Sequence, residues 1–204
     1  MASPLLIAAL CMGKRHTGAF LFCFAGMGMC LLSAYLNTFL AALYGADAFA
    51  ATVEIAPVVE EGMKLLPLLF YLLVFEPQAR QIGIAAVITA LSFATFENIC
   101  YLIQNGAAHF SFIFFRGIGT GAMHVICGAI VGGGLAYVWR RTWLKIAGTC
   151  GLLGAAITFH AIYNLLIAYG GTAQYIAYLL PVGKICLPTT AKRILFFWIS
   201  KCLV

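Results

Sequence analysis

Ionisable side chains recur inside the apolar segments of this 204-residue chain. They are Glu60, Glu61, Lys64, Glu97, Arg116, His124 and His160, with Asn164 as a polar neighbour. Glu60 and Glu61 lie four and three residues before Lys64, so on a helix both carboxylates share a face with the lysine. His160 and Asn164 are also four residues apart. Carboxylates and imidazoles in this pattern suit the activation of water beside a carbonyl group.

Two mechanisms fit these residue types. In the first, a carboxylate in a poorly solvated cavity takes a proton from water, and histidine and asparagine donors stabilise the developing oxyanion. In the second, glutamate and histidine side chains hold a zinc ion that activates the water. The candidate metal ligands are Glu60, Glu97, His124 and His160. No HExxH zinc motif is present. No serine or cysteine has an evident base partner, which argues against serine and cysteine catalysis.

The elements that position these residues follow from the composition. The chain is 64% hydrophobic and only 9% charged, whereas a soluble domain carries about 25% charged residues. Apolar runs of about 20 residues recur, so lipid must surround most of the chain. The formal net charge is +6. The basic residues lie in short groups between the apolar runs and form no basic stripe or arm, which argues against a nucleic-acid partner.

We predict an all-α, polytopic transmembrane bundle of about six spans (six to seven) in a single domain over residues 1–204. The spans are expected near residues 17–44, 54–75, 82–104, 112–139, 146–169 and 172–187, with EEGMK interrupting the second. The motif-bearing core is 54–169, and 190–204 is expected to be an interfacial tail. Gly117 with Gly121, and Gly128 with Gly132, predict two small-residue faces for close helix packing.

Basic residues predict the orientation of the spans. Alternate ends carry nine of the 12 Lys and Arg residues: Lys14, Arg15, Arg80, Arg140, Arg141, Lys145, Lys192, Arg193 and Lys201. The opposite loops, near residues 45–51, 105–109 and 170–171, carry none. With six spans, both termini are therefore expected in the cytoplasm.

This orientation places the ionisable residues of four helices at one depth. At 1.5 Å of rise per residue, these residues lie roughly 8 to 18 Å from the outer boundary of the membrane: Glu60, Glu97, His124, His160 and Asn164. A charge at the bilayer centre costs at least about 2.5–3.5 kcal/mol and usually faces a protein interior or a water-filled cavity. We therefore expect one shared site in the outer half of the membrane.

Four motifs, in this order, resemble the PrsW-type intramembrane proteases: EEGMK at 60–64, FATFE at 93–97, His124 after Arg116, and HAIYN at 160–164. That family is related to the CAAX-prenyl endopeptidases and the bacterial Abi proteins. The resemblance implies a multi-pass endopeptidase of the prokaryotic plasma (inner) membrane. Its substrate would be a single-span membrane protein cleaved near the extracytoplasmic face, with first-site cleavage of an anti-sigma factor as the best-known role. Family members are described as metalloproteases, whereas the CAAX relatives are argued to be glutamate-based.

The resemblance also implies roles for individual residues. Glu60 would be the base, Glu61 its partner and Glu97 a second essential carboxylate. The water- or oxyanion-binding groups would be His124, His160 and Asn164, with Lys64 and Arg116 in support.

Other interpretations of the same residues remain open. The carboxylates could relay ions in an ion- or proton-coupled transporter, although the two halves of the chain show no inverted repeat. A catalytically inactive, Abi-like immunity or binding protein would carry the same motifs. Glu60 and Glu61 could also form a structural ion pair with Lys64, and Glu97 could be a structural partner of Arg116 or Lys64.

Overall fold

The computed structural model describes residues 14–105 and 110–185, which form helices and no strand. The elements are α2 (Lys14–Tyr44), α3 (Ala48–Ala50), a π-helix (Ala51–Ile55), α4 (Ala56–Phe75), α5 (Ala79–Asn105), α6 (Phe110–Val138), a 3-10 turn (Thr142–Leu144), α7 (Lys145–Tyr169) and α8 (Gly171–Ile185). The all-helical prediction is confirmed. The expected interfacial tail, 190–204, lies outside the described residues.

Four described helices are long and apolar enough to cross a membrane. They are Gly18–Tyr44, Ala79–Gln104, Phe114–Val138 and Thr142–Tyr169, which match the first, third, fourth and fifth expected spans. The second expected span, α4, carries three ionisable side chains in 20 residues. The sixth, α8, has only 15 residues, about 22 Å at 1.5 Å each, which is shorter than the roughly 30 Å hydrocarbon core. The count of about six spans is therefore not confirmed.

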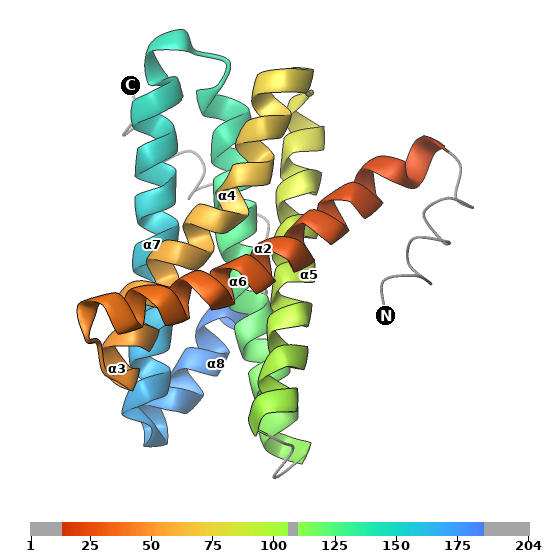
Figure 1. The fold of residues 1–204 in the computed structure, drawn as a ribbon. Coiled ribbons are helices and arrows are strands. Elements are labelled where there is room, and N and C mark those ends of the chain that lie inside the picture. The colour runs from red at the N-terminus through yellow and green to blue at the C-terminus, as the bar shows by residue number, and fades with distance from the viewer. Residues whose placement is uncertain (1–13, 106–109, 186–204) are drawn as a thin grey trace.

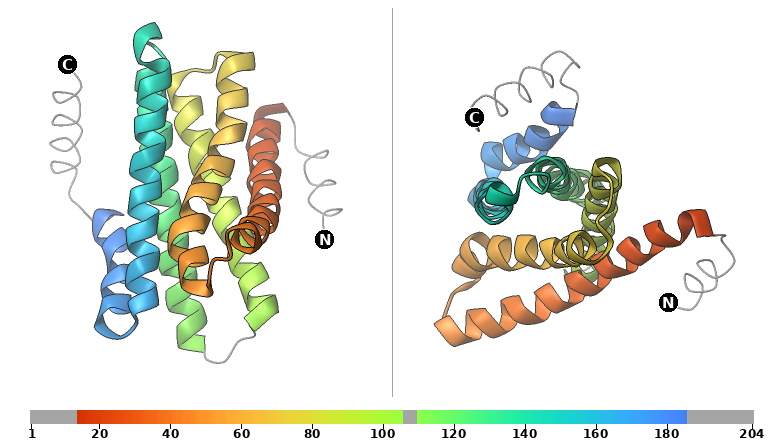
Figure 2. Two further views of the ribbon diagram at one scale, coloured as in Figure 1. Left: turned by 60° about the vertical axis from the view of Figure 1, so that its left-hand side comes forward. Right: turned by 90° about the horizontal axis from the view of Figure 1, so that it is seen from above.

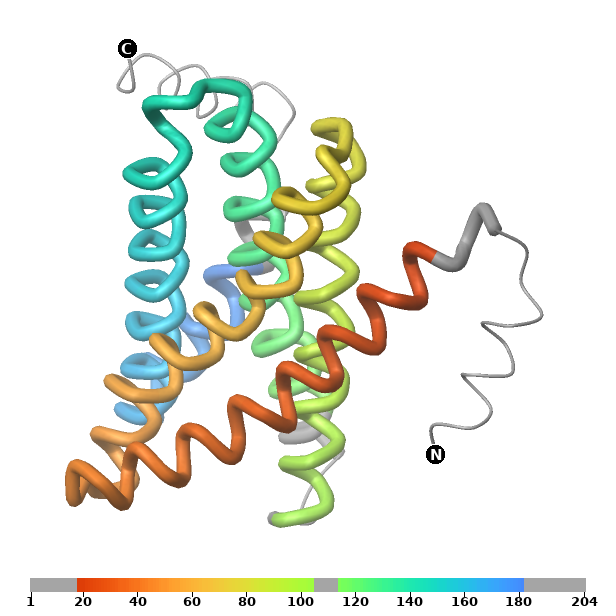
Figure 3. The backbone as a smooth tube through the Cα atoms, turned by 45° about the horizontal axis from the view of Figure 1, so that its top comes forward, coloured from red at the N-terminus to blue at the C-terminus, as the bar shows by residue number. Residues whose placement is uncertain are grey.

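The helices differ in their tilt. α5, α6 and α7 run almost upright beside one another, whereas α4 leans across them and α2 lies obliquely over α4 and α5 (Figure 1). The view from above in Figure 2 shows α2 and α4 passing along one side of the upright helices. Figure 3 shows the same crossing in the backbone trace, with α8 packed beside the lower parts of α6 and α7. The candidate site lies where α4 passes α5, α6 and α7.

Glycines set the closest helix contacts. A Cβ added at Gly128 or Gly132 of α6 would collide with Ala90 or Ala86 of α5, which confirms that this small-residue face packs against a neighbouring helix. The prediction that Gly117 and Gly121 form a second close-packing face is wrong, because Cβ atoms added at these positions meet nothing within 4 Å. Gly119, which points in another direction around α6, meets Tyr178 of α8 instead.

The entry to α4 is irregular, and α4 itself is continuous. Asp47 caps α3 by accepting a hydrogen bond from the backbone N–H of Ala50 at 2.8 Å. The π-helix follows, and α4 then begins with Pro57 in its first turn, where a proline removes no helical hydrogen bond. EEGMK interrupts the apolar character of this segment but not the helix, since residues 60–64 continue α4. The irregularity lies one turn earlier, in the π-helix.

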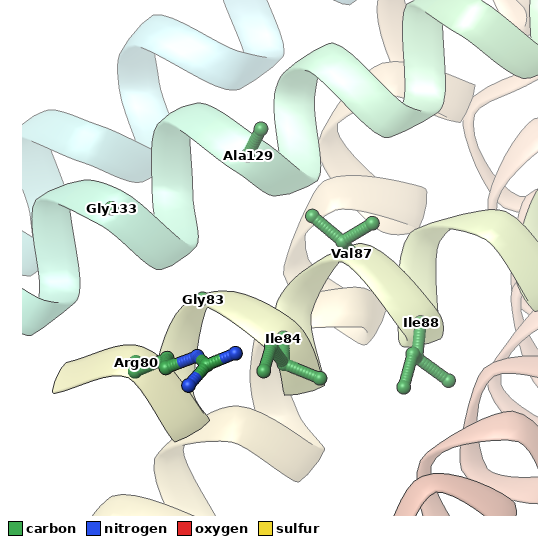
Figure 4. Close-up of a pocket in the computed structure, with 7 residues that line it drawn as sticks. All are labelled: Arg80, Gly83, Ile84, Val87, Ile88, Ala129 and Gly133. Atoms are coloured by element: carbon green, nitrogen blue, oxygen red, sulfur yellow. The ribbon is translucent and has the colours of Figure 1, made fainter. Parts of the chain in front are cut away.

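An open apolar groove lies between α5 and α6, away from this crossing. Its lining residues are Arg80, Gly83, Ile84, Val87, Ile88, Ala129 and Gly133 (Figure 4). None of them belongs to the predicted acid and imidazole set. The candidate site is therefore identified by its side-chain contacts and not by this groove.

Candidate active site

Seven of the eight predicted site residues form one contiguous cluster. α4 contributes Glu60, Glu61 and Lys64; α5 contributes Glu97; α6 contributes Arg116 and His124; α7 contributes His160. Residues up to 99 positions apart in the chain are in direct contact. The structure thus brings together the carboxylates and imidazoles that the sequence placed at one depth.

Glu61 lies at the centre of the cluster and is only 3% exposed. Its Oε1 accepts hydrogen bonds from Lys64 Nζ at 2.6 Å and from His160 Nδ1 at 2.8 Å. A carboxylate on Nδ1 fixes the tautomer of the ring, so the Nε2 lone pair of His160 is free to face a ligand. Glu61 therefore orients His160 and neutralises Lys64.

His124 is fully buried and links Lys64 to Glu97. Lys64 Nζ lies 2.8 Å from His124 Nδ1, and Glu97 Oε2 lies 2.6 Å from His124 Nε2. An ammonium donates to Nδ1, so Nε2 carries the hydrogen that Glu97 accepts. The two imidazole rings meet edge to face, with centroids 5.0 Å apart and an interplanar angle of 89°.

Glu97 lies at the more open side of the cluster, with its side chain 25% exposed. Its Oε1 is 3.5 Å from Arg116 Nη2, and the Arg116 guanidinium stacks on Tyr101 at 3.6 Å from the ring centroid. Stacking and pairing together hold the guanidinium in one place. Arg116 thus contacts the site through Glu97.

Glu60 differs from the other two carboxylates. Its Oε1 accepts a hydrogen bond from Asn37 Nδ2 at 3.3 Å. Its Oε2 is buried and has no hydrogen-bond partner among the described residues. That oxygen is 3.8 Å from His160 Nε2, too far for a direct hydrogen bond. Two acceptors that face each other across this distance require a hydrogen donor or a cation between them.

Glu60, His124 and His160 could hold a metal ion, because their ligand atoms lie within 4.8 Å of one another. Two imidazoles and one carboxylate form a ligand set of catalytic zinc sites. Glu61 on His160 Nδ1 is the outer-shell contact that such histidines usually make. The residues fit a metal in type and position. To bind the ion, His124 would have to give up the hydrogen bond of one ring nitrogen, either to Lys64 or to Glu97. Glu97, predicted as a further ligand, instead accepts a hydrogen bond from His124.

Asn164 is the predicted residue that the structure does not bring into the cluster. Its Nδ2 donates to the backbone carbonyl of Thr52 at 2.9 Å, which ties α7 to the π-helix. The amide that was expected to stabilise an oxyanion is therefore occupied by the backbone. The spacing to His160 placed both side chains on one side of α7 but gave no information on this partner.

Asn37 is the residue of the site that the sequence interpretation missed. It lies on α2 and is the only residue of that helix with a recorded hydrogen bond to a predicted site residue, among those the structure describes. A signal was available, because Asn37 is the only amide side chain in a mostly apolar span.

Comparison with known proteins adds one finding. A family model described as PrsW family intramembrane metalloprotease matches residues 14–186. The matched segment contains every residue of the cluster. No curated protein and no solved structure matches the chain.

Proposed function

The chain belongs to the PrsW family of intramembrane metalloproteases, and from this premise we propose that it cleaves a single-span membrane protein near the extracytoplasmic face of a prokaryotic plasma membrane. The observation that carries the proposal is the buried pair of Glu60 Oε2 and His160 Nε2, which face each other at 3.8 Å. A water molecule between them would meet a proton acceptor in a site largely shielded from bulk water. An anti-sigma factor is the substrate type that the resemblance of the motifs implies.

The proposed side of cleavage rests on orientation. Basic residues at alternate ends of the spans put both termini in the cytoplasm if α4 and α8 also cross. The cluster then lies in the outer half of the membrane. A peptide bond close to the outer end of a substrate helix could reach it after local unwinding, which exposes the carbonyl group to attack.

We assign Glu60, His124 and His160 as the residues that would hold a divalent metal such as zinc. When bound, the metal would supply an activated water and polarise the substrate carbonyl. The chain's own residues prepare the site. Glu61 holds His160 by Nδ1 so that Nε2 faces Glu60. Lys64 keeps Glu61 neutralised.

A metal-free mechanism is the second candidate, because both ring nitrogens of His124 already have partners. Here Glu60 takes a proton directly from a water molecule held against His160. The only ring hydrogen of His124 is bonded to Glu97, so His124 would donate to the developing oxyanion only by exchanging Glu97 for it. Both mechanisms use the same residues and differ in whether activity needs a metal.

The test uses purified full-length protein and a tagged single-span substrate. We expect cleavage, and we expect Glu60→Gln, Glu97→Gln and His160→Ala each to lower kcat/KM at least about 100-fold. Glu54→Gln is the matched control, because Glu54 is an exposed carboxylate that precedes α4. Ion flux in liposomes without proteolysis would instead support a transporter, and partner binding without cleavage an inactive relative.

Metal content decides between the two mechanisms. Elemental analysis of active protein is expected to find about one equivalent of zinc, and chelation is expected to abolish cleavage. Full activity in metal-free protein would reject the metal site and leave the glutamate mechanism.

A further inference from the structure

Asn37 has a contact that neither the motifs nor the family description accounts for. Its Nδ2 donates to Glu60 Oε1 at 3.3 Å, across 23 residues of chain. Its Oδ1 is buried and has no hydrogen-bond partner among the described residues. An amide with an unmet acceptor is unfavourable inside a membrane protein. Packing alone therefore does not explain a polar residue at this position.

The face of α2 that carries Asn37 is fixed against the bundle. Gly26, Cys30, Ser33 and Asn37 recur at intervals of four, three and four residues, which places them on one side of the helix. Cys30 and Ser33 are buried, as is Gly26, whereas the other residues of α2 whose burial is described are exposed or half-buried. At Gly26 the helix touches α5 so closely that an added Cβ would collide with the Thr89 carbonyl oxygen and the Ser92 hydroxyl. α2 is thus fixed against α5 at Gly26, a point about three helical turns before Asn37.

The contact decides how the Glu60 carboxylate is turned. The terminal torsion of a glutamate side chain is broad and weakly restrained. Asn37 engages one carboxylate oxygen, and the other then points towards His160 Nε2 at 3.8 Å. Without this donor the carboxylate would be free to rotate. This rotation would lower the fraction of molecules in which Oε2 faces His160.

We propose that Asn37 is a positioning residue that holds Glu60 by Oε1 and so presents Oε2 to the reaction. The proposal rests on the proposed proteolytic function of the same cluster. It assigns α2, which carries none of the recognised motifs, a direct part in assembling the site. It holds whether Oε2 binds a metal or takes a proton from water.

A purely structural amide that joins α2 to α4 would behave differently. Its loss would lower the melting temperature and the yield of folded protein without changing the turnover of the molecules that remain folded. Loss of a positioning residue lowers kcat and leaves KM nearly unchanged, because substrate binding does not depend on how the carboxylate is turned.

The first measurement compares Asn37→Leu, Asn37→Gln and the control Ser33→Ala in full-length protein. Asn37→Leu keeps the approximate volume and removes the donor, and we expect kcat to fall about 10- to 100-fold with KM within about twofold. Asn37→Gln keeps a donor amide and should recover most of that loss. Ser33 is buried on the same face of α2, and Ser33→Ala should leave kcat unchanged. Wild-type kcat in Asn37→Leu, or no recovery in Asn37→Gln, would overturn the proposal.

A second measurement does not depend on proteolysis. Melting temperatures are compared for Asn37→Leu, Glu60→Ala and the double variant. If the two side chains interact, Asn37→Leu shifts the melting temperature in the wild-type background and not in the Glu60→Ala background. Equal shifts in both backgrounds would reject the contact. A coupled pair in a protein that cleaves nothing would reject the proposed function and leave the contact standing.

Discussion

The three glutamates of this site differ in the hydrogen-bond partners of their carboxylates, and this difference gives them different roles. Glu61 Oε1 accepts hydrogen bonds from both Lys64 and His160, and Glu97 is held between His124 and Arg116. Glu60 alone of the three has a buried oxygen recorded without a partner. This difference in partners supports Glu60 as the reacting carboxylate, the role that the resemblance of EEGMK also implies.

Lys64 gives the first prediction at this scale. Lys64→Met leaves buried Glu61 without its cation, and loss of one partner of a buried pair costs about 3–5 kcal/mol. We expect a lower free energy of unfolding in detergent and loss of cleavage. The double variant Lys64→Met/Glu61→Gln removes the stranded charge and should regain part of the stability. Equal stability of the single and double variants would contradict this account of the pair.

Asn164 gives the second prediction. Asn164→Leu removes the hydrogen bond to the Thr52 carbonyl, and we expect a loss of unfolding free energy of about 0.6–2 kcal/mol, typical of hydrogen bonds between membrane helices. Thr158→Val, an exposed change on the same helix, serves as the control. A large fall in kcat without any loss of stability would show that Asn164 stabilises an oxyanion, as the family resemblance implies.

At the scale of the element, the α5–α6 contact shows what residue spacing can and cannot predict. Small residues four apart predicted close packing at Gly128 and Gly132, and the contact forms. The same pattern at Gly117 and Gly121 forms no such contact. Spacing determines that two residues share a face, but only the positions of the neighbouring helices determine whether that face is covered.

Neighbouring glycines of α6 allow a matched test of this contact. Gly132→Leu would drive a side chain into Ala86 and the backbone of α5, whereas Gly133→Leu enters open space. We expect Gly132→Leu to lower the melting temperature strongly and to abolish cleavage, because α5 and α6 carry Glu97 and His124. Gly133→Leu should stay close to wild type. Equal effects of the two substitutions would mean that the helices do not pack at this face.

At the scale of the whole molecule, the sequence predicted the helical class and the convergence of Glu60, Glu97, His124 and His160. Intramembrane charges must find partners, which makes depth informative even without a structure. The sequence did not predict the contact of Asn37 with Glu60. That contact depends on the tilt and the crossing point of α2, which are set by contacts such as that of Gly26 with α5. The π-helix at Ala51–Ile55 was also missed, since its hydrogen-bond pattern leaves no clear mark in residue spacing.

Orientation in the membrane provides the last prediction. If six helices cross the membrane, the distribution of basic residues predicts that Asp47 lies outside the cell and Thr142 in the cytoplasm. In intact cells, Asp47→Cys should react with a membrane-impermeant maleimide, whereas Thr142→Cys should react only after the membrane is opened. The parent protein, with its own cysteines, is the control for background labelling. The reverse pattern would move the site to the cytoplasmic half of the membrane.

The charges on α4 also have a consequence for biosynthesis. At about 2.5–3.5 kcal/mol for each charge near the bilayer centre, a nascent segment with Glu60, Glu61 and Lys64 would be poorly retained by the insertion machinery on its own. Its histidine partner from α7 is made 99 residues after Glu61. If α4 crosses the membrane, we therefore expect its stable insertion to await the synthesis of later helices, and we expect a chain truncated before α7 to be degraded by quality-control proteases.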